Sequence, residues 1–331
     1  MRRAPGSPAS ARIRLVRPLL RGPVDKRTCE TRISSTQSSA GMFQPLHKTI
    51  IGTIRRLPLP VARLAFRAYD KMLRMQGVEH LGTTRFGARI HCDPVDLIQR
   101  TILHFGVWEP DVSQVISDRL APGDVFVDIG ANIGYDALLA SSRVGVRGIV
   151  VAIEASPRTF ALLKRNLAVN AFASNVRAVN LAVSDRPGTL DLYEINSRNI
   201  GAATTLASRG GLHMASVEAQ PLEQILTGEE IARIRLIKMD VEGAEPPILS
   251  QLLERLANYP ATMEIVVEAT PEDDRASWQD VFERMQAAGF SAWAIDNGYE
   301  LEWYLRWRRP GALKRVETVP VRQQDLLFTR A

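Results

Sequence analysis

The stretch VFVDIGANIGYDAL, from Val125 to Leu138, decides the fold of this chain. It begins with β-branched and apolar residues, reaches Asp128, turns through Gly130 and Gly134, and enters a helical pattern. The N–H groups of a first helical turn have no partner inside the helix, and glycine lets a ligand approach the backbone closely. A strand, a glycine turn and a helix in this order therefore predict a nucleotide-binding βα unit.

The alternation of strand and helix continues to about residue 300. Further strands are predicted at 148–154, 176–184, 234–240 and 263–269. Helices are predicted at 134–143, 157–170, 244–257 and 274–288. Ser156 is the expected N-cap of the second helix, and GFSAWAIDNGYELEW predicts a terminal hairpin that turns at Asn297-Gly298. Continuous apolar strands separated by helices predict an α/β fold with a mainly parallel sheet.

The middle of the glycine turn distinguishes between two classes of nucleotide. A dinucleotide-binding fingerprint has a second glycine that lets a pyrophosphate come close, whereas this turn reads Gly130-Ala131-Asn132-Ile133-Gly134. The carboxylate of Asp128 would repel a pyrophosphate and attract a cationic ligand. The pattern therefore favours S-adenosylmethionine, a phosphate-free nucleoside with an ammonium and a sulfonium group.

The ends of the next two strands supply further candidate cofactor contacts. Glu154 lies 20 residues after Gly134, where an acid can accept hydrogen bonds from ribose hydroxyls. Ser184 and Asp185 end the third strand, where a polar side chain can meet the adenine amino group. A glycine turn alone is also explained as a tight βα connection, but the ordered set favours a cofactor site. The predicted cofactor-binding residues are Asp128, Gly130, Ala131, Asn132, Gly134, Glu154, Ser184 and Asp185.

Four segments between about residues 100 and 300 resemble the FkbM family of S-adenosylmethionine-dependent methyltransferases. They are GVWEP, PGDVFVDIGANIG, VAIEASPRTFALLKRNLAVN and IKMDVEGAE. The resemblance implies a class I, Rossmann-like sheet of seven strands with a terminal antiparallel hairpin. It also implies methyl transfer, usually to a hydroxyl oxygen of a sugar or another small metabolite. The family's threonine-leucine-aspartate stretch is replaced here by Gln220-Pro221-Leu222-Glu223, which weakens the inference about the substrate.

Methyl transfer to a hydroxyl needs an aligned nucleophile and a base that removes its proton. Candidate acids end two neighbouring strands, with Asp240 and Glu242 after the fourth and Glu268 at the end of the fifth. Lys238 would neutralise these acids or orient the substrate oxygen. Glu245 is either a further base or a helix-start acid favoured by the dipole, and both interpretations stay open. The predicted catalytic residues are Asp240, Glu242, Lys238 and Glu268, and the 5 histidines and 2 cysteines predict no metal site.

The net charge of +6 is concentrated at the N-terminus. Residues 1–41 hold 9 basic and 2 acidic residues, so the rest of the chain carries 33 basic and 34 acidic residues. This part is predicted to be a disordered basic tail, and an organelle transit segment or an extension before a true start at Met42 are the other interpretations. The body's charge and the sparse cysteines favour a small-molecule acceptor over nucleic acid and a reducing, cytoplasmic location. No apolar stretch reaches the roughly 18 residues of a membrane span.

The division expected after the tail has three parts. These are N-terminal helices and short strands packing on the core at 42–107, the methyltransferase domain at 108–310, and a C-terminal extension at 311–331. After the LPLP break at 57–60, a helix places apolar residues on one face and basic residues on the other. The apolar set is Val61, Leu64, Ala65, Ala68 and Met72, and the basic set is Arg63, Arg67, Lys71 and Arg74. The favoured interpretation is a helix that covers the core with a solvated basic face, and the alternative is peripheral contact of 42–76 with anionic lipid.

Two other functions remain open from the sequence. A non-catalytic S-adenosylmethionine-binding regulator would need the same glycine turn but no base. A nucleic-acid methyltransferase could use WYLRWRRP, from Trp303 to Pro310, where aromatic and basic residues alternate. A hairpin strand with a solvated edge explains that segment more simply, and the oligomeric state is not predicted.

Overall fold

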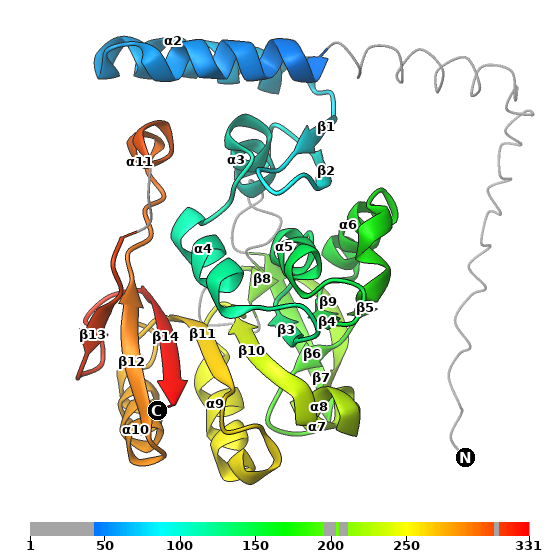
Figure 1. Ribbon diagram of the computed structural model, residues 1–331, viewed down its shortest axis with the longest axis vertical. Helices are drawn as coiled ribbons and strands as arrows, with labels where there is room; N and C mark the ends of the chain where they lie inside the picture. Colours follow the sequence, from blue (N-terminus) through cyan, green and yellow to red (C-terminus); the bar gives the residue numbers. More distant parts are fainter. Residues whose placement is uncertain (1–42, 195–202, 205–210, 308–310, 331) are drawn as a thin grey trace, which may run out of the picture. The chain divides into compact units, whose positions relative to one another are not determined.

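A sheet of eight strands forms the centre of the chain (Figure 1). The computed structural model describes residues 43–194, 203–204, 211–307 and 311–330, which belong to one compact unit. Across the sheet the order is β13 (Lys314–Val316), β12 (Phe290–Ile295), β14 (Gln324–Arg330), β11 (Glu264–Ala269), β10 (Ile234–Met239), β3 (Val125–Ile129), β4 (Ile149–Ile153) and β5 (Val176–Val179). The five strands from β11 to β5 pair in parallel, whereas β14 is antiparallel to both β11 and β12. The predicted seven-stranded sheet is therefore confirmed, and β13 adds a short eighth strand at one edge.

Helices cover both faces of this sheet, as the continuous apolar strands predict. Because side chains alternate along a strand, Val127 of β3 faces a core with α9 (Glu245–Glu254) and α10 (Arg275–Ala287). Phe126 faces the opposite core with α4 (Pro110–Arg119) and α5 (Tyr135–Val144). Asp128 and Lys238, which are neighbours on parallel strands, point to the same side of the sheet as Phe126. Both charged side chains are therefore buried between the sheet and the helices.

The strand predicted at 176–184 is wrong as a single element. It divides into β5 and β6 (Ala182–Val183), and β6 belongs to a second sheet with β9 (Leu212–Gln220), β7 (Gly188–Glu194) and β8 (Ala203–Thr204). Asn180 lies between the two parts, and its side-chain amide donates to the carbonyl oxygens of Glu154 (2.8 Å) and Ala155 (3.0 Å). These bonds hold the chain end of β5 beside the loop after β4, so the strand does not continue.

The hairpin predicted at Asn297-Gly298 is also wrong. After β12 the chain passes through a loop into α11 (Leu301–Arg306), and β12 is paired instead by β13 and β14. Asn297 donates through Nδ2 to Asp325 of β14 at 3.2 Å, and Gly298 lies directly against the ring of Trp303. The segment from Trp303 to Trp307 is therefore not a strand edge, and residues 308–310 lie outside the described part of the chain.

The N-terminal region has no separate core. A helix over residues 43–56 and α2 (Leu59–Gln76) meet at the predicted LPLP break, followed by β1 (His80–Thr83), β2 (Arg89–Cys92) and α3 (Leu97–Phe105). Their buried side chains join one cluster with Tyr135 of α5 and Tyr304 of α11. None of the described helices is long and apolar enough to cross a membrane.

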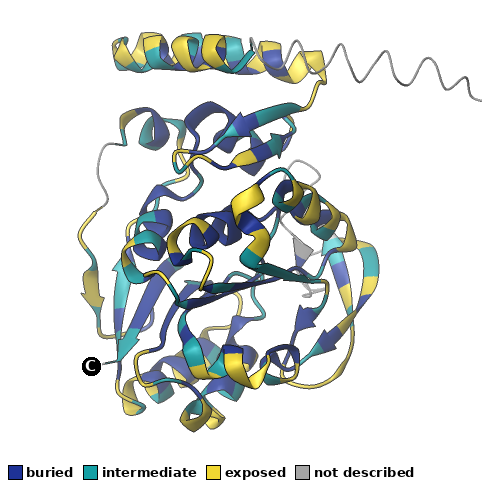
Figure 2. Ribbon diagram, turned by 45° about the vertical axis from the view of Figure 1, so that its right-hand side comes forward, coloured by how far each residue is buried: buried dark blue, intermediate teal, exposed yellow. Residues whose placement is uncertain are grey.

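The inward face of α2 differs from the predicted one. The buried residues of this helix are Ala62, Phe66, Asp70 and Leu73. Of the apolar set predicted to face the core, Val61, Leu64, Ala68 and Met72 are exposed, and Ala65 is half-buried (Figure 2). The aromatic ring of Phe66 stacks on Phe105, and Asp70 accepts a hydrogen bond from His104 at 3.1 Å. These two contacts fix the rotation of the helix.

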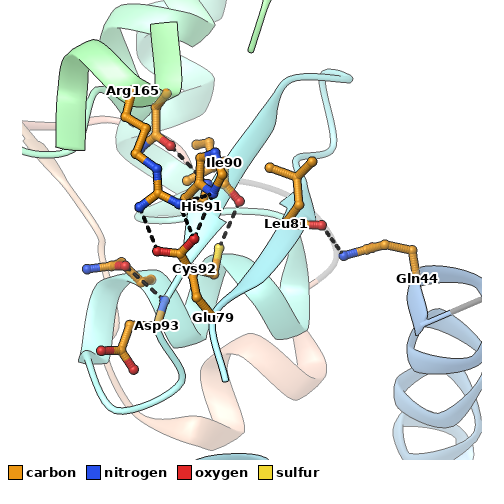
Figure 3. Close-up of polar contacts among 10 residues, drawn as sticks. Gln44, Glu79, Leu81, Ile90, His91, Cys92, Asp93 and Arg165 are labelled. Atoms are coloured by element: carbon orange, nitrogen blue, oxygen red, sulfur yellow. Dashed lines mark hydrogen bonds and ion pairs between the residues drawn. The ribbon is translucent and has the colours of Figure 1, made fainter. Parts of the chain in front are cut away.

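The β1–β2 hairpin is attached to α6 (Pro157–Ala168) by polar contacts (Figure 3). Arg165 of α6 donates to Glu79 at 2.8 Å, and the His91 ring contacts the same carboxylate at 2.8 Å. Asn166 accepts from the His91 backbone N–H at 2.9 Å and donates to the carbonyl oxygen of Ile133 at 2.8 Å. One side chain therefore joins the hairpin to the glycine turn.

Candidate active site

A cavity of about 290 Å³ opens at the carboxyl ends of β3, β4, β10 and β11. This is the edge where open α/β sheets place their ligands. One side is lined by the glycine turn and the segments after β4 and β5, namely Gly130, Ala131, Asn132, Ile133, Glu154, Ala155, Ser156, Leu181, Ala182 and Val183. The polar and aromatic residues of the other side are Trp108, Glu109, Tyr135, Asp136, Lys238, Asp240, Glu242, Glu268, Tyr299 and Gln323.

The glycine turn lies against the end of β10. Gly130 has φ +82°, and a Cβ built on it would lie 1.8 Å from the carbonyl oxygen of Asp240. The N–H groups of Gly130 and Ala131 both donate to the Ile153 carbonyl oxygen at 2.9 Å. Only glycine fits here. Because Gly130 has no Cβ, the ends of β3, β4 and β10 can lie in contact at this turn.

Glu154 organises the turn through both carboxylate oxygens. Oε2 accepts from the N–H of Asn132 at 2.9 Å, and Oε1 accepts from the N–H of Ser156 at 2.8 Å. Asn132 adopts φ 49°, a left-handed conformation that asparagine tolerates better than most residues. Burial raises the pKa of Glu154 to about 7. Each oxygen keeps capacity for a second hydrogen bond, which is what a ribose hydroxyl requires.

Lys238 is surrounded by carboxylates. Its Nζ lies 3.2 Å from Asp136 Oδ2 and 3.2 Å from Asp240 Oδ2. Although burial lowers it, these neighbours and Asp128 hold the pKa of Lys238 well above its ordinary value. Asp128 is fully buried, and neither of its oxygens has a hydrogen-bond partner among the described residues. Burial raises the pKa of the Asp128 carboxyl to about 8.

A second group of acids lies toward the C-terminal strands. Tyr299 donates to Glu109 Oε1 at 2.9 Å, and Gln323 donates to Glu268. Burial, with the nearby carboxylates, raises the pKa of Glu268 to about 10 and that of Asp325 to about 7. Among the described residues around the cavity, acids outnumber the single lysine, so a cationic ligand would relieve the repulsion between them.

The same part of the chain matches a known family. The family described as the methyltransferase FkbM domain matches residues 128–292. The chain belongs to the FkbM methyltransferase family. It is an S-adenosylmethionine-dependent methyltransferase.

Three curated relatives show the extent of this likeness. Methyltransferase sdnD of Sordaria araneosa is 28% identical over 62% of this chain and 84% of that protein. The 31-O-demethyl-FK506 methyltransferase FkbM of Streptomyces tacrolimicus is 29% identical, covering 52% and 79%. The hexuronic acid methyltransferase AglP of Haloferax volcanii is 26% identical, covering 50% and 65%. A solved O-methyltransferase from Thermotoga maritima is 15% identical, with a TM-score of 0.38 over 77% of each chain.

The cavity of this FkbM domain fits S-adenosylmethionine in two respects. Because Gly130 has no side chain, a ligand can approach the backbone of the turn, and the carboxylate oxygens of Glu154 lie at the end of β4. The acids Asp136 and Asp240, which line the cavity around Lys238, give the charge that a sulfonium and an ammonium prefer, whereas the buried Asp128 does not line it. Among the described residues, no three His, Cys, Asp or Glu side chains are grouped so as to hold a metal ion.

Most predicted site residues gather at this cavity. The four predicted catalytic residues, Lys238, Asp240, Glu242 and Glu268, all line it, as do Gly130, Ala131, Asn132 and Glu154. Gly134 is the N-cap of α5, and Asp128 lies in β3 opposite Lys238.

Ser184 and Asp185 do not line the cavity. Ser184 donates through Oγ to the Arg186 carbonyl oxygen at 2.6 Å, and Asp185 is exposed. Glu245 instead folds the loop before α9, because its Oε1 accepts from the N–H groups of Val241 (2.9 Å) and Gly243 (3.3 Å).

Asp136, Tyr299 and Gln323 are among the lining residues that sequence reasoning missed. Asp136 lies in the first turn of α5, where an acid is also explained by the helix dipole. Tyr299 and Gln323 come from the loop after β12 and the segment before β14, with no motif around them. For Asp136 the signal was its place two residues after Gly134, whereas the other two positions depend on the tertiary fold.

Proposed function

We propose that this enzyme methylates a hydroxyl oxygen of a sugar or another small metabolite. The names of two relatives support this class of acceptor, one a demethyl-FK506 O-methyltransferase and the other a hexuronic acid methyltransferase. The aromatic residues Trp303 and Trp307 offer little support for nucleic acid. Trp303 packs against the N-terminal core, and Trp307 stacks under Arg85 at 4.8 Å and donates to Asp111.

The position of Asp240 carries the proposal. Its backbone carbonyl touches the turn at Gly130, and its carboxylate is paired with Lys238 at 3.2 Å while remaining partly exposed to the cavity. S-adenosylmethionine would supply a methyl group bonded to a positively charged sulfur. A carboxylate held this close to the glycine turn can accept the hydroxyl proton as the oxygen–carbon bond forms and the carbon–sulfur bond breaks, which leaves a neutral thioether. General-base assistance of this kind contributes about 10²–10⁴-fold in rate.

Glu268 has a different role from Asp240. With its pKa raised to about 10, its carboxyl is protonated at neutral pH before a cationic ligand enters. A protonated carboxyl donates a hydrogen bond and so can hold an acceptor oxygen but cannot remove its proton. Asp240 is therefore the proposed base, Lys238 holds its carboxylate in place, and Glu268 and Glu242 position the acceptor.

Methyl transfer from isotopically labelled S-adenosylmethionine to a panel of sugars and hydroxylated metabolites, read by mass spectrometry, tests the proposal. Asp240→Asn should lower turnover by about 10²-fold or more while leaving cofactor binding in calorimetry within a few-fold. Asp185→Asn, at an exposed position outside the cavity, is the matched control and should behave as wild type. Transfer to amines in place of hydroxyls would overturn the acceptor class, and wild-type turnover by Asp240→Asn would overturn the base.

A further inference from the structure

The outward face of α2 is apolar. Val61, Leu64, Ala68, Met72 and Met75 are exposed, with Leu64 at 72% and Met75 at 76% of full exposure. At 3.6 residues per turn these five positions fall within an arc of roughly 80° on one side of the helix. We call this set the apolar stripe. A contiguous apolar strip on a water-facing helix marks a surface that meets another apolar phase.

Basic side chains flank the apolar stripe along one edge. Arg63, Arg67, Lys71 and Arg74 occupy the adjoining arc, and all are exposed. Arg63 pairs with Glu302 and Arg74 with Asp70, whereas Arg67 and Lys71 extend from the middle of the helix. The acid of α2 is Asp70, and it is buried. The outward surface of the helix therefore combines apolar and positively charged groups without a carboxylate.

The helix cannot turn the apolar stripe inward. Phe66 packs between His104 and Phe105, with ring centroids 4.8 and 5.5 Å away. On the same inward face Asp70 contacts His104 at 3.1 Å and Arg100 at 3.4 Å. Rotation of α2 would bring apolar side chains onto His104 and Arg100 and would expose Phe66 and Leu73. The exposure of the stripe is a property of the folded protein.

We infer that α2 binds the surface of an anionic membrane, with its axis parallel to the bilayer. The apolar stripe would enter the boundary between headgroups and acyl chains, and Arg67 and Lys71 would meet lipid phosphates. A second copy of this chain fits less well, because the two basic flanks would repel each other. Residues 1–41 also fit less well as a cover, since they carry 9 basic and 2 acidic residues.

Flotation of the full chain with phosphatidylcholine vesicles, with and without phosphatidylglycerol, tests the inference. The wild type should float with the anionic vesicles and stay at the bottom with the neutral ones, and added salt should reduce its recovery. Leu64→Glu should lower the partition coefficient tenfold or more. Arg67→Glu with Lys71→Glu should lower it by at least about 25-fold, since each basic residue contributes about fivefold near an anionic surface.

Val146→Glu is the matched control, because Val146 is 89% exposed and belongs to the turn between α5 and β4, not to α2. It should float like the wild type, and all variants should keep the wild-type melting temperature and cofactor affinity. Equal recovery with both vesicle types would overturn the inference. If Leu64→Glu floats as well as the wild type, binding belongs to the basic tail at residues 1–41. If light scattering shows a dimer that this substitution converts to a monomer, the apolar stripe serves self-association. Either result also overturns the inference.

Discussion

Replacing Gly130 by alanine tests the contact that joins the glycine turn to the end of β10, which carries the proposed base Asp240. The new Cβ would stand 1.8 Å from the Asp240 carbonyl oxygen, whereas real Cβ contacts are essentially never shorter than 3.0 Å. The turn and the end of β10 must therefore separate by at least 1.2 Å. Displacement by about 1 Å of a group that positions reactants can lower turnover about 10²-fold.

The effect on stability has two sources. An alanine in the left-handed region costs about 1–2 kcal/mol, and forcing atoms into a packed site adds about 1–3 kcal/mol. Gly130→Ala should therefore lower the free energy of unfolding by about 2–5 kcal/mol in urea titrations. Calorimetry should show affinity for S-adenosylmethionine falling together with turnover.

Gly123→Ala isolates the first of these sources. Gly123 has φ +97°, close to that of Gly130, but a Cβ there meets no atom within 4 Å. This control should lose about 1–2 kcal/mol and keep the wild-type affinity and turnover. If the two variants lose the same stability and both bind the cofactor normally, the contact with Asp240 does not constrain the site, and the reasoning fails.

Three further predictions concern the charges at the cavity. The free energy of unfolding of the ligand-free protein should fall as pH rises from about 5 to 8, because Glu154 and Asp128 bind protons more tightly in the folded than in the unfolded protein. Urea unfolding at several pH values measures this. A free energy of unfolding that stays constant or rises over this range would contradict it. Lys238→Met should lower the free energy of unfolding by about 3–5 kcal/mol at pH 8, because it leaves the carboxylates of Asp136 and Asp240 without their cation, and by less at pH 6, where more of the acids are protonated. An equal loss at both pH values would contradict this coupling between Lys238 and the acids. Glu154→Gln should weaken cofactor binding about tenfold or more in calorimetry while Ser184→Ala leaves it unchanged, and the reverse order would restore the sequence-based assignment of Ser184.

The edge of the sheet where the candidate site residues gather was predictable, because most of these residues lie in contiguous motifs. Asp128 is the last residue but one of β3, Asp240 directly follows β10, and parallel strands bring their carboxyl ends together. The resemblance to the FkbM family added the identity of the transferred group. Gln323 and Asp325 could not be placed, because β14 inserts antiparallel beside β11 and brings them there from the end of the sequence, and Tyr299 could not because the loop after β12 does not form the predicted hairpin.

The wrong predictions have a common physical origin in tertiary contacts. α2 carries apolar residues on two nearly opposite faces, and hydrophobic periodicity does not decide which face turns inward; the contacts of Phe66 and Asp70 with α3 do. The strand at 176–184 ends early because Asn180 bonds to backbone beyond β4. The Asn297-Gly298 pair resembles a hairpin turn locally, but Asn297 bonds to Asp325 instead.

The place of β14 has a consequence for how the protein is made. On the ribosome, β11 and β12 emerge first, but in the folded sheet they do not pair with each other, because β14 lies between them. Their facing edges stay without partners until residue 330 has been synthesised, and unpaired strand edges are sites of aggregation in nascent chains. Loss of β14 would leave the same two edges open permanently.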